Sequence, residues 1–225
     1  MENLIRTILP ELDERYKTYA LNHHFPGYAY GILLDGKLIH TASGGFIDTI
    51  KKIPATPKSM FRIASMTKSF TAMAVLKLRD EGNLRLDDPV EHYIPQMRGQ
   101  RLTTDDADIT IRDLLVHSAG LPTDDPWADR LLDQKEEDLF LLLEKKLNFS
   151  SSPGTAFEYS NLGYTLLGSL IQKASGLSYQ EYINKTILGP LGMCAFWDYK
   201  DAPQDRLARG YRFKDAKREE EPLLR

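Results

Sequence analysis

Residues 62–82 read RIASMTKSFTAMAVLKLRDEG, and this stretch predicts a helix. No charge interrupts it between Lys68 and Lys77. Gly82 marks its end, because glycine readily adopts the left-handed conformation in which many helices terminate. We therefore expect a helix from about Ser65 to Glu81. Its lysine stands three residues after a serine, so Lys68 is either a surface charge or a base that activates Ser65.

Ser65 and Lys68 have the spacing of a nucleophile and its base. Residues i and i+3 lie on one face of a helix. A serine hydroxyl needs a neighbouring base, and a lysine can serve only when neutral, which costs about 4–5 kcal/mol at pH 7. Burial and a helix N-terminus both lower that cost, and the amide of Ser65 is a candidate donor to an oxyanion. About one Ser-x-x-Lys is expected by chance in such a chain, so context must decide.

A second group must pass the proton to the leaving group, and a tyrosine near a cationic lysine is suited to this. Two Tyr-x-Asn triplets occur, YSN and YIN. In YIN, Tyr182 and Asn184 would lie on a helix and point about 200° apart, which fits a half-buried aromatic and a surface residue. YSN lies in a loop, where functional side chains more often occur. We therefore choose Tyr159 and Asn161 as the second part of the site.

SMTK at 65–68 and YSN at 159–161 resemble the first two active-site motifs of the serine β-lactamases and penicillin-binding proteins. The resemblance extends over about residues 25–212, through phrases such as ITIRDLLVHSAGLP and SSPGTAFEYSNLGYTLLGSLIQKASG. It points to the branch of class C β-lactamases, D-alanyl-D-alanine carboxypeptidases and related esterases.

The resemblance implies a role for each residue of the two motifs. Ser65 would be the acylated nucleophile, Lys68 its base partner and Tyr159 the proton shuttle. Asn161 would donate a hydrogen bond to the amide or ester of the substrate. His117, in the phrase HSAGLP, would have a packing role. The implied substrate is a small ester, amide or β-lactam, with no cofactor and no metal.

One departure from the family pattern concerns its third motif, Lys-Thr-Gly or His-x-Gly on a strand that borders the site. No such tripeptide follows residue 161. The resemblance implies an α+β fold of the β-lactamase/transpeptidase type, with an antiparallel sheet flanked by helices and a helical region. We expect this chain to hold the N-terminal part of one such domain, with the sheet and the closing C-terminal helix incomplete.

Within residues 1–225 we expect three segments. Residues 1–64 would form a helix, at 3–22, and the first two strands, at 28–34 and 37–43, joined by a tight turn at Asp35-Gly36. Residues 65–200 would be mainly helical and carry both motifs, and residues 201–225 would begin the C-terminal part. The other expected elements are a loop at 46–59, helices at 110–118, 135–147 and 162–174, a helix capped by Ser178 and Glu181, and a charged, solvated tail.

Composition bounds the class of protein. The chain has 225 residues, of which 42% are hydrophobic and 27% charged, as in ordinary globular domains. A net charge of -3 gives no reason to expect nucleic acid or an anionic membrane as partner. The single cysteine, Cys194, excludes an intrachain disulfide, and the histidines show no metal-ligand spacing. No signal peptide or membrane span is visible, so we expect a cytoplasmic protein and favour an ester or D-amino-acid peptide as substrate over a β-lactam.

An alternative function belongs to a different class. The missing third motif and the incomplete sheet fit a catalytically silent chain that acts as a binding or assembly module. An exposed sheet edge would then favour self-association or pairing with another chain.

Overall fold

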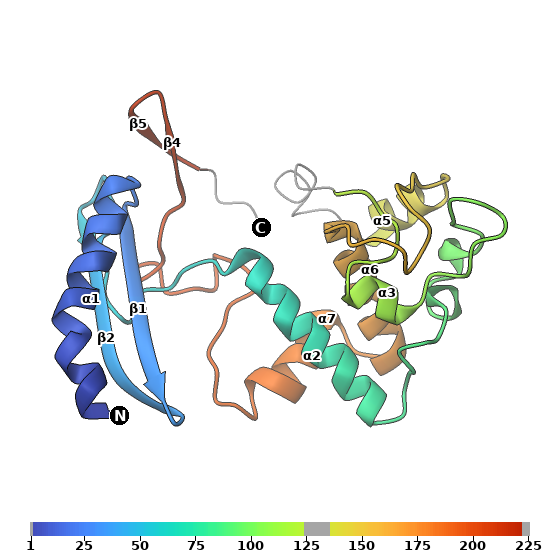
Figure 1. Cartoon of the computed structure of the whole chain (residues 1–225), viewed down its shortest axis with the longest axis horizontal. Coiled ribbons are helices and arrows are strands. Elements are labelled where there is room, and N and C mark those ends of the chain that lie inside the picture. The colour runs from blue at the N-terminus through green and yellow to red at the C-terminus, as the bar shows by residue number, and fades with distance from the viewer. Residues whose placement is uncertain (1, 124–135, 222–225) are drawn as a thin grey trace. The chain divides into compact units, whose positions relative to one another are not determined.

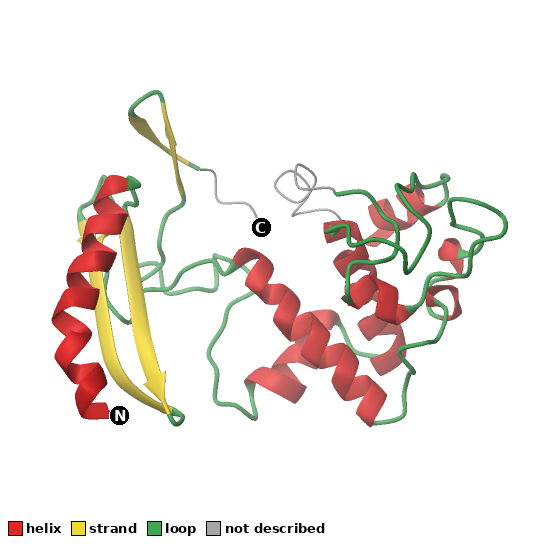
Figure 2. Cartoon of the chain, viewed as in Figure 1, coloured by secondary structure: helices red, strands yellow, loops and turns green. Residues whose placement is uncertain are grey.

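The strands lie in one part of the chain together with the N-terminal helix, and the remaining helices lie in another (Figure 2). The computed structural model describes residues 2–123 and 136–221. The first residue of the helix predicted at 135–147 and the last four of the predicted C-terminal segment lie outside these ranges. The chain divides into two compact units, Met1–Arg62 with Phe196–Arg225, and Ile63–Ala195. The named strands of the described residues all belong to the first unit, and the predicted α+β class is confirmed.

The first unit is built on the predicted hairpin. β1 (Gly27–Leu34) pairs antiparallel with β2 (Lys37–Asp48), with a bulge between Ile32 and Leu33. Asp35 and Gly36 have φ values of 49° and 74°. A two-residue hairpin turn of this type needs positive φ at both positions, which explains the Asp-Gly signal.

β2 is longer than the sequence predicts, and the loop expected at 46–59 is wrong in its first part. The strand runs on to Asp48, and β3 (Ile53–Pro54) pairs with it. The carboxylate of Asp48 is buried and accepts hydrogen bonds from the amides of Ile50 and Lys51. This side chain therefore closes the turn between the two strands, as aspartate does in many turns.

α1 (Glu2–Asn22) lies along the β1–β2 hairpin (Figure 1), and the predicted helix at 3–22 is confirmed with Pro10 inside it. A polar cluster fixes this contact. Asp13 of α1 accepts hydrogen bonds from the hydroxyl of Tyr30 and from Nε2 of His40. The ring of Tyr16 stacks on that of Tyr30 with centroids 3.9 Å apart.

Asp13 gives a testable dependence of stability on pH. Hydrogen bonds from Tyr30 and then from His40 hold the pKa of its carboxyl below the ordinary value. A carboxyl whose pKa is lower in the folded protein than in the unfolded chain stabilises the fold when the pH is above about 4. This contribution is lost as the pH falls through the pKa of the folded state. Asp13→Asn should therefore lower the urea midpoint at pH 7, and the difference from wild type should shrink toward pH 3.

The matched control for that experiment is Glu14→Gln, on the same helix. Among the described residues Glu14 pairs with Lys17 three residues on, and its side chain is 65% exposed. Exposed pairs of this kind contribute little, so the control should follow the wild type at every pH. A difference between Asp13→Asn and wild type that stays constant from pH 7 to pH 3 would contradict the assignment.

The described part of the predicted charged tail is mostly exposed, as expected, and it belongs to a hairpin. β4 (Tyr211–Lys214) pairs antiparallel with β5 (Lys217–Glu220) through a turn in which Asp215 and Ala216 both have positive φ. The hydroxyl of Tyr211 accepts a hydrogen bond from the amide of Thr49, which ties the hairpin to the end of β2. The sequence did not show this hairpin, because its strands are short and mostly exposed. The apolar alternation of YRFK spans only four residues, and KREE has no apolar residue.

The second unit is helical. Its α-helices in the described residues are α2 (Thr67–Asp80), α3 (Ile111–Leu115), α5 (Glu136–Leu143), α6 (Asn161–Ser175) and α7 (Tyr179–Ile183). Three short 3₁₀ turns accompany them, η1 (Ala64–Met66), η2 (Val90–His92) and η3 (Pro95–Met97), and η4 (Asn184–Leu188) is a π-helix. Among the described residues, no helix combines the length and apolar character needed to cross a membrane.

The core of this unit lies where α2 packs against α6 and α7 (Figure 1). The side chains that close it are fully buried: Val75 and Leu78 on α2, and Leu166, Leu167, Leu170 and Ile171 on α6. Two predicted capping boxes begin helices as expected, at Thr110 for α3 and at Ser178 for α7. α6 ends at Gly176 with a φ of 71°, the left-handed cap that the glycine predicted.

Candidate active site

The backbone around Ser65 differs from the predicted helix start. Ser65 lies on the 3₁₀ turn η1, and the α-helix proper begins at Thr67. Ala64 just before it has a φ of 45°, an uncommon conformation for a residue with a side chain. Such backbone strain is often found at functional positions. In a 3₁₀ turn residues i and i+3 eclipse each other, so the predicted proximity of Ser65 and Lys68 survives the change of helix type.

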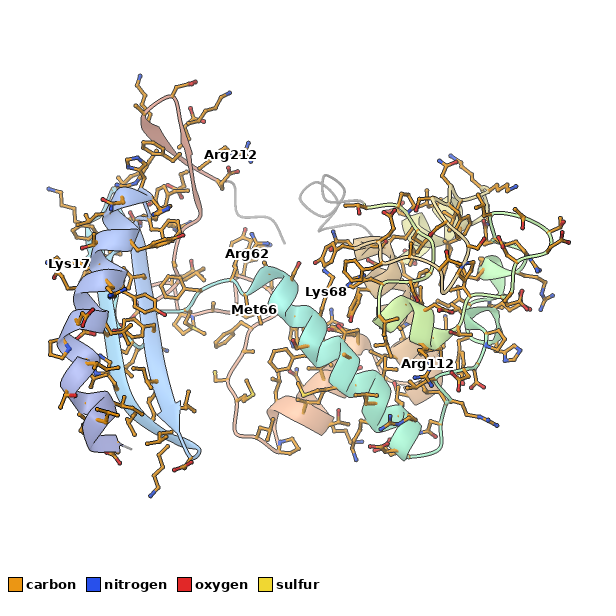
Figure 3. All side chains as sticks on the ribbon, in the orientation of Figure 1. Lys17, Arg62, Met66, Lys68, Arg112 and Arg212 are labelled. Carbon is orange, nitrogen blue, oxygen red and sulfur yellow. The ribbon has the colours of Figure 1, made fainter. Side chains whose placement is uncertain are left out.

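The side chains of Tyr159 and Asn161 reach the hydroxyl of Ser65 and the amine of Lys68 (Figure 3 marks Lys68 near the start of α2). Nζ of Lys68 lies 3.2 Å from Oγ of Ser65 and 2.6 Å from Oδ1 of Asn161. The hydroxyl of Tyr159 lies 2.8 Å from Oγ of Ser65. The four residues chosen from the sequence thus form one connected network, although 94 positions separate Ser65 from Tyr159.

Lys68 is half-buried and sits among groups that stabilise a cation. Its Nζ lies 4.8 Å from the ring centroid of Tyr159 and 5.5 Å from that of Tyr164. Ring faces and an amide oxygen both attract an ammonium group. The uncharged run after Lys68 has its buried side chains on the face of α2 that packs in the core, such as Ala74 and Val75.

The loop-to-helix junction at Ser160 explains how Tyr159 and Asn161 reach the same place. Ser160 is the N-cap of α6, and its hydroxyl accepts a hydrogen bond from the amide of Gly163. Tyr159 therefore lies just before the cap, and Asn161 is the first residue of the helix. A cap residue has an extended backbone while the next residue is helical, and this change of direction sets its two neighbours side by side.

The other triplet does not join the site. Tyr182 is only 4% exposed and belongs to the hydrophobic core, so it is more buried than the sequence suggested. Burial and the carboxylate of Glu81 raise its pKa to about 12. Asn184 is exposed, as expected, and begins the π-helix η4.

Two residues at the site were not chosen from the sequence. Tyr164 places its ring over Lys68, and its hydroxyl donates to the carbonyl of Leu115. Burial is the main cause that raises the pKa of Tyr164, and the nearby Tyr159 adds to it. A usable signal was present, because Tyr164 follows Asn161 by three residues and so lies on the same face of α6. The second residue is His117, whose ring contacts both Tyr159 and Tyr164.

The chain is similar to known proteins over most of its length. The family model described as Beta-lactamase matches residues 5–225. Protein flp of Staphylococcus aureus (strain NCTC 8325 / PS 47) is 36% identical over 177 residues, which cover 76% of this chain and 34% of that protein. Penicillin-binding protein 4* of Bacillus subtilis (strain 168) is 31% identical over 187 residues, or 81% of this chain and 40% of that protein.

Solved structures show the same relationship. The octameric penicillin-binding protein homologue from Pyrococcus abyssi superposes with a TM-score of 0.83 at 32% identity, and the match covers 95% of this chain and 50% of that one. A class C β-lactamase gives a TM-score of 0.79 at 26% identity, over 97% of this chain and 58% of the other. The chain therefore spans about half the length of these solved relatives and less of the curated ones, and the predicted family and fold are confirmed.

Proposed function

Because the chain belongs to the Beta-lactamase family, we propose that it is a serine hydrolase that cleaves an ester or amide through an acyl-enzyme on Ser65. One observation carries the proposal. Oγ of Ser65 lies within hydrogen-bonding distance of both Nζ of Lys68 and the hydroxyl of Tyr159. A serine next to a base that a third group orients is the general arrangement of an activated nucleophile.

In the proposed reaction, Oγ of Ser65 attacks the carbonyl carbon of the substrate, and its proton passes to the amine of Lys68 in its neutral form. Tyr159 donates its hydroxyl proton to the leaving oxygen or nitrogen as the bond to the carbonyl carbon breaks, and takes a proton back from Lys68. Water attacks the resulting ester, releases the acid and restores the serine. Asn161 would donate to the amide or ester of the bound substrate, and the amide of Ser65 would be one donor to the oxyanion.

The test is covalent labelling of the full gene product with a fluorophosphonate or a labelled penicillin, read by mass spectrometry. Trypsin cuts after Arg62 and Lys68, so the peptide 63–68 carries Ser65 but not Ser69. The adduct is expected on this peptide, and fragmentation separates Ser65 from Thr67. A labelled protein whose adduct lies elsewhere, or no adduct with either reagent, would refute the proposal.

The substrate class is a separate part of the proposal. We place an ester or a D-amino-acid peptide ahead of a β-lactam. A panel of p-nitrophenyl esters, D-Ala-D-Ala peptides and nitrocefin separates these classes. Ester or peptide turnover is expected to exceed nitrocefin turnover, and the reverse order would overturn this preference.

A second candidate is a silent chain that serves in assembly. It is favoured by the octameric state named for the Pyrococcus abyssi relative. Size-exclusion chromatography with light scattering, combined with the labelling above, distinguishes the two. A large assembly without labelling supports the second candidate, and a labelled monomer rules it out.

A further inference from the structure

We propose that His117 is a positioning residue for this reaction, which holds the segment 158–160 and through it the side chains of Tyr159 and Asn161. The inference rests on the proposed function, since it assigns His117 a part in the acylation of Ser65. It adds to the packing role that the family resemblance implied for this residue.

The first observation is a pair of hydrogen bonds from one residue. The carbonyl oxygen of His117 accepts from the amide of Glu158 at 2.8 Å. Nδ1 of its imidazole accepts from the amide of Ser160 at 3.1 Å. His117 therefore binds the amides on both sides of Tyr159, one with its main chain and one with its ring. The second of these amides belongs to the N-cap that separates Tyr159 from Asn161.

The second observation is the backbone of His117 itself, which has a φ of 58°. Few residues other than glycine adopt this left-handed conformation readily, and histidine, asparagine and aspartate are the enriched exceptions. In this conformation both the carbonyl and the ring of His117 reach the 158–160 segment. A residue that only filled space in a turn would gain nothing from holding both groups there.

The third observation is aromatic packing around the amine. The imidazole lies 4.6 Å from the ring of Tyr159 and 4.9 Å from the ring of Tyr164, measured between centroids, with interplanar angles of 33° and 32°. These are the two rings whose faces lie near Nζ of Lys68. A shift of the His117 ring would therefore disturb both the tyrosine that contacts Ser65 and the surroundings of Lys68.

The hydrogen bond also fixes the tautomer. Nδ1 can accept from the Ser160 amide only if it carries no proton, so the proton of a neutral imidazole sits on Nε2. The ¹⁵N chemical shifts of the His117 ring in the full gene product report this directly. Nδ1 should give the signal of an unprotonated nitrogen, and a protonated Nδ1 would overturn the proposal whatever the activity.

Two substitutions that both tolerate positive φ separate the hydrogen bond from the backbone. His117→Asn keeps an acceptor, Oδ1, near the position of Nδ1, whereas His117→Gly removes the side chain without adding backbone strain. The rate constant for labelling of Ser65 should fall about 10²-fold in the glycine variant, because a shift of about 1 Å at a reacting group has an effect of this size. The asparagine variant should recover most of that loss.

His92→Asn is the matched control, because His92 is exposed on η2 and belongs to no part of the site. It should label like the wild type. Equal rates for wild type and His117→Gly, or equal losses in the glycine and asparagine variants, would overturn the proposal. If His117→Gly fails to fold, the comparison of His117→Asn with wild type and the ¹⁵N shifts decide it.

Hydrogen exchange at Ser160 keeps this test separate from the proposed function. If the wild type is not labelled at Ser65, the proposed function fails, and the Ser160 amide still reports on His117. Its exchange should be slow in wild type and His117→Asn and faster in His117→Gly. Unchanged exchange in His117→Gly would show that His117 does not hold the segment.

Discussion

In a Lys68→Arg variant, Ser65 is expected to be acylated about 10³-fold more slowly than in the wild type. This is the typical size of a general acid–base contribution. Lys68 has a compact ammonium group, 3.2 Å from Oγ of Ser65 and 2.6 Å from Oδ1 of Asn161. Arginine keeps the charge but cannot give up a proton in a protein, and its planar fork does not match these two positions. The measurement is the rate constant of fluorophosphonate labelling, read on the peptide 63–68.

The matched control is Lys173→Arg on α6. Lys173 also places its Nζ over an aromatic ring, 5.5 Å from the centroid of Phe140, and near a carboxylate, Glu136, at 4.0 Å. It belongs to no part of the site, so its replacement should leave labelling unchanged. If the labelling rate constant of Lys68→Arg falls by less than about tenfold, Lys68 supplies charge alone, and its proposed role in proton transfer is wrong.

A Leu170→Ala variant is expected to lower the free energy of unfolding by about 2–5 kcal/mol, the range for removing a buried leucine side chain. Leu170 is completely buried in the core that α6 forms with the other helices of the second unit. Its neighbours are fixed by a close-packed core, so the space left behind would not collapse fully. Urea unfolding of wild type and variant, followed by circular dichroism, measures the difference.

Leu141→Ala is the control for this prediction. Leu141 lies on α5 in the same unit, but it is 58% exposed. A surface substitution of this kind should change the unfolding free energy by no more than about 0.5 kcal/mol. The urea slope should be the same for wild type and both variants. Equal destabilisation by Leu141→Ala and Leu170→Ala would show that the described core is not the one that stabilises the protein.

The elements predicted well are those whose signals are local in the chain. The Asp35-Gly36 turn and the caps at Thr110 and Ser178 each depend on residues within three positions of one another, and the structure has all three. Local steric preference and short-range hydrogen bonds decide such features before any tertiary contact forms.

The errors lie where distant residues decide the backbone. β2 continues to Asp48 because β3 pairs with it. The apolar alternation of β4 spans only four residues and β5 has no apolar residue, and Tyr211 ties their hairpin to Thr49, far away in the sequence. Strand length depends on the partner that supplies the hydrogen bonds, which no local pattern reports.

The candidate site shows the same division. The spacing of Ser65 and Lys68 places them together in either type of helix, so the sequence by itself determined that pair. The choice of Tyr159 and Asn161 depended on reading YSN as a loop next to a helix cap. The sequence did not reveal that Lys68 would face two tyrosine rings, or that His117 would bind the amides flanking Tyr159.

By itself, the sequence of this protein determined its family resemblance, most of its helices, its first hairpin and the pairing of Ser65 with Lys68. Only the tertiary structure decided that Tyr159 meets Ser65 and that Asn161 meets Lys68. It also decided that His117 binds the amide of Ser160, the residue between Tyr159 and Asn161. The physical reason is the range of the interactions. Turns, caps and i,i+3 neighbours are fixed over a few residues, whereas contacts across about ninety residues exist only after the helical core has packed.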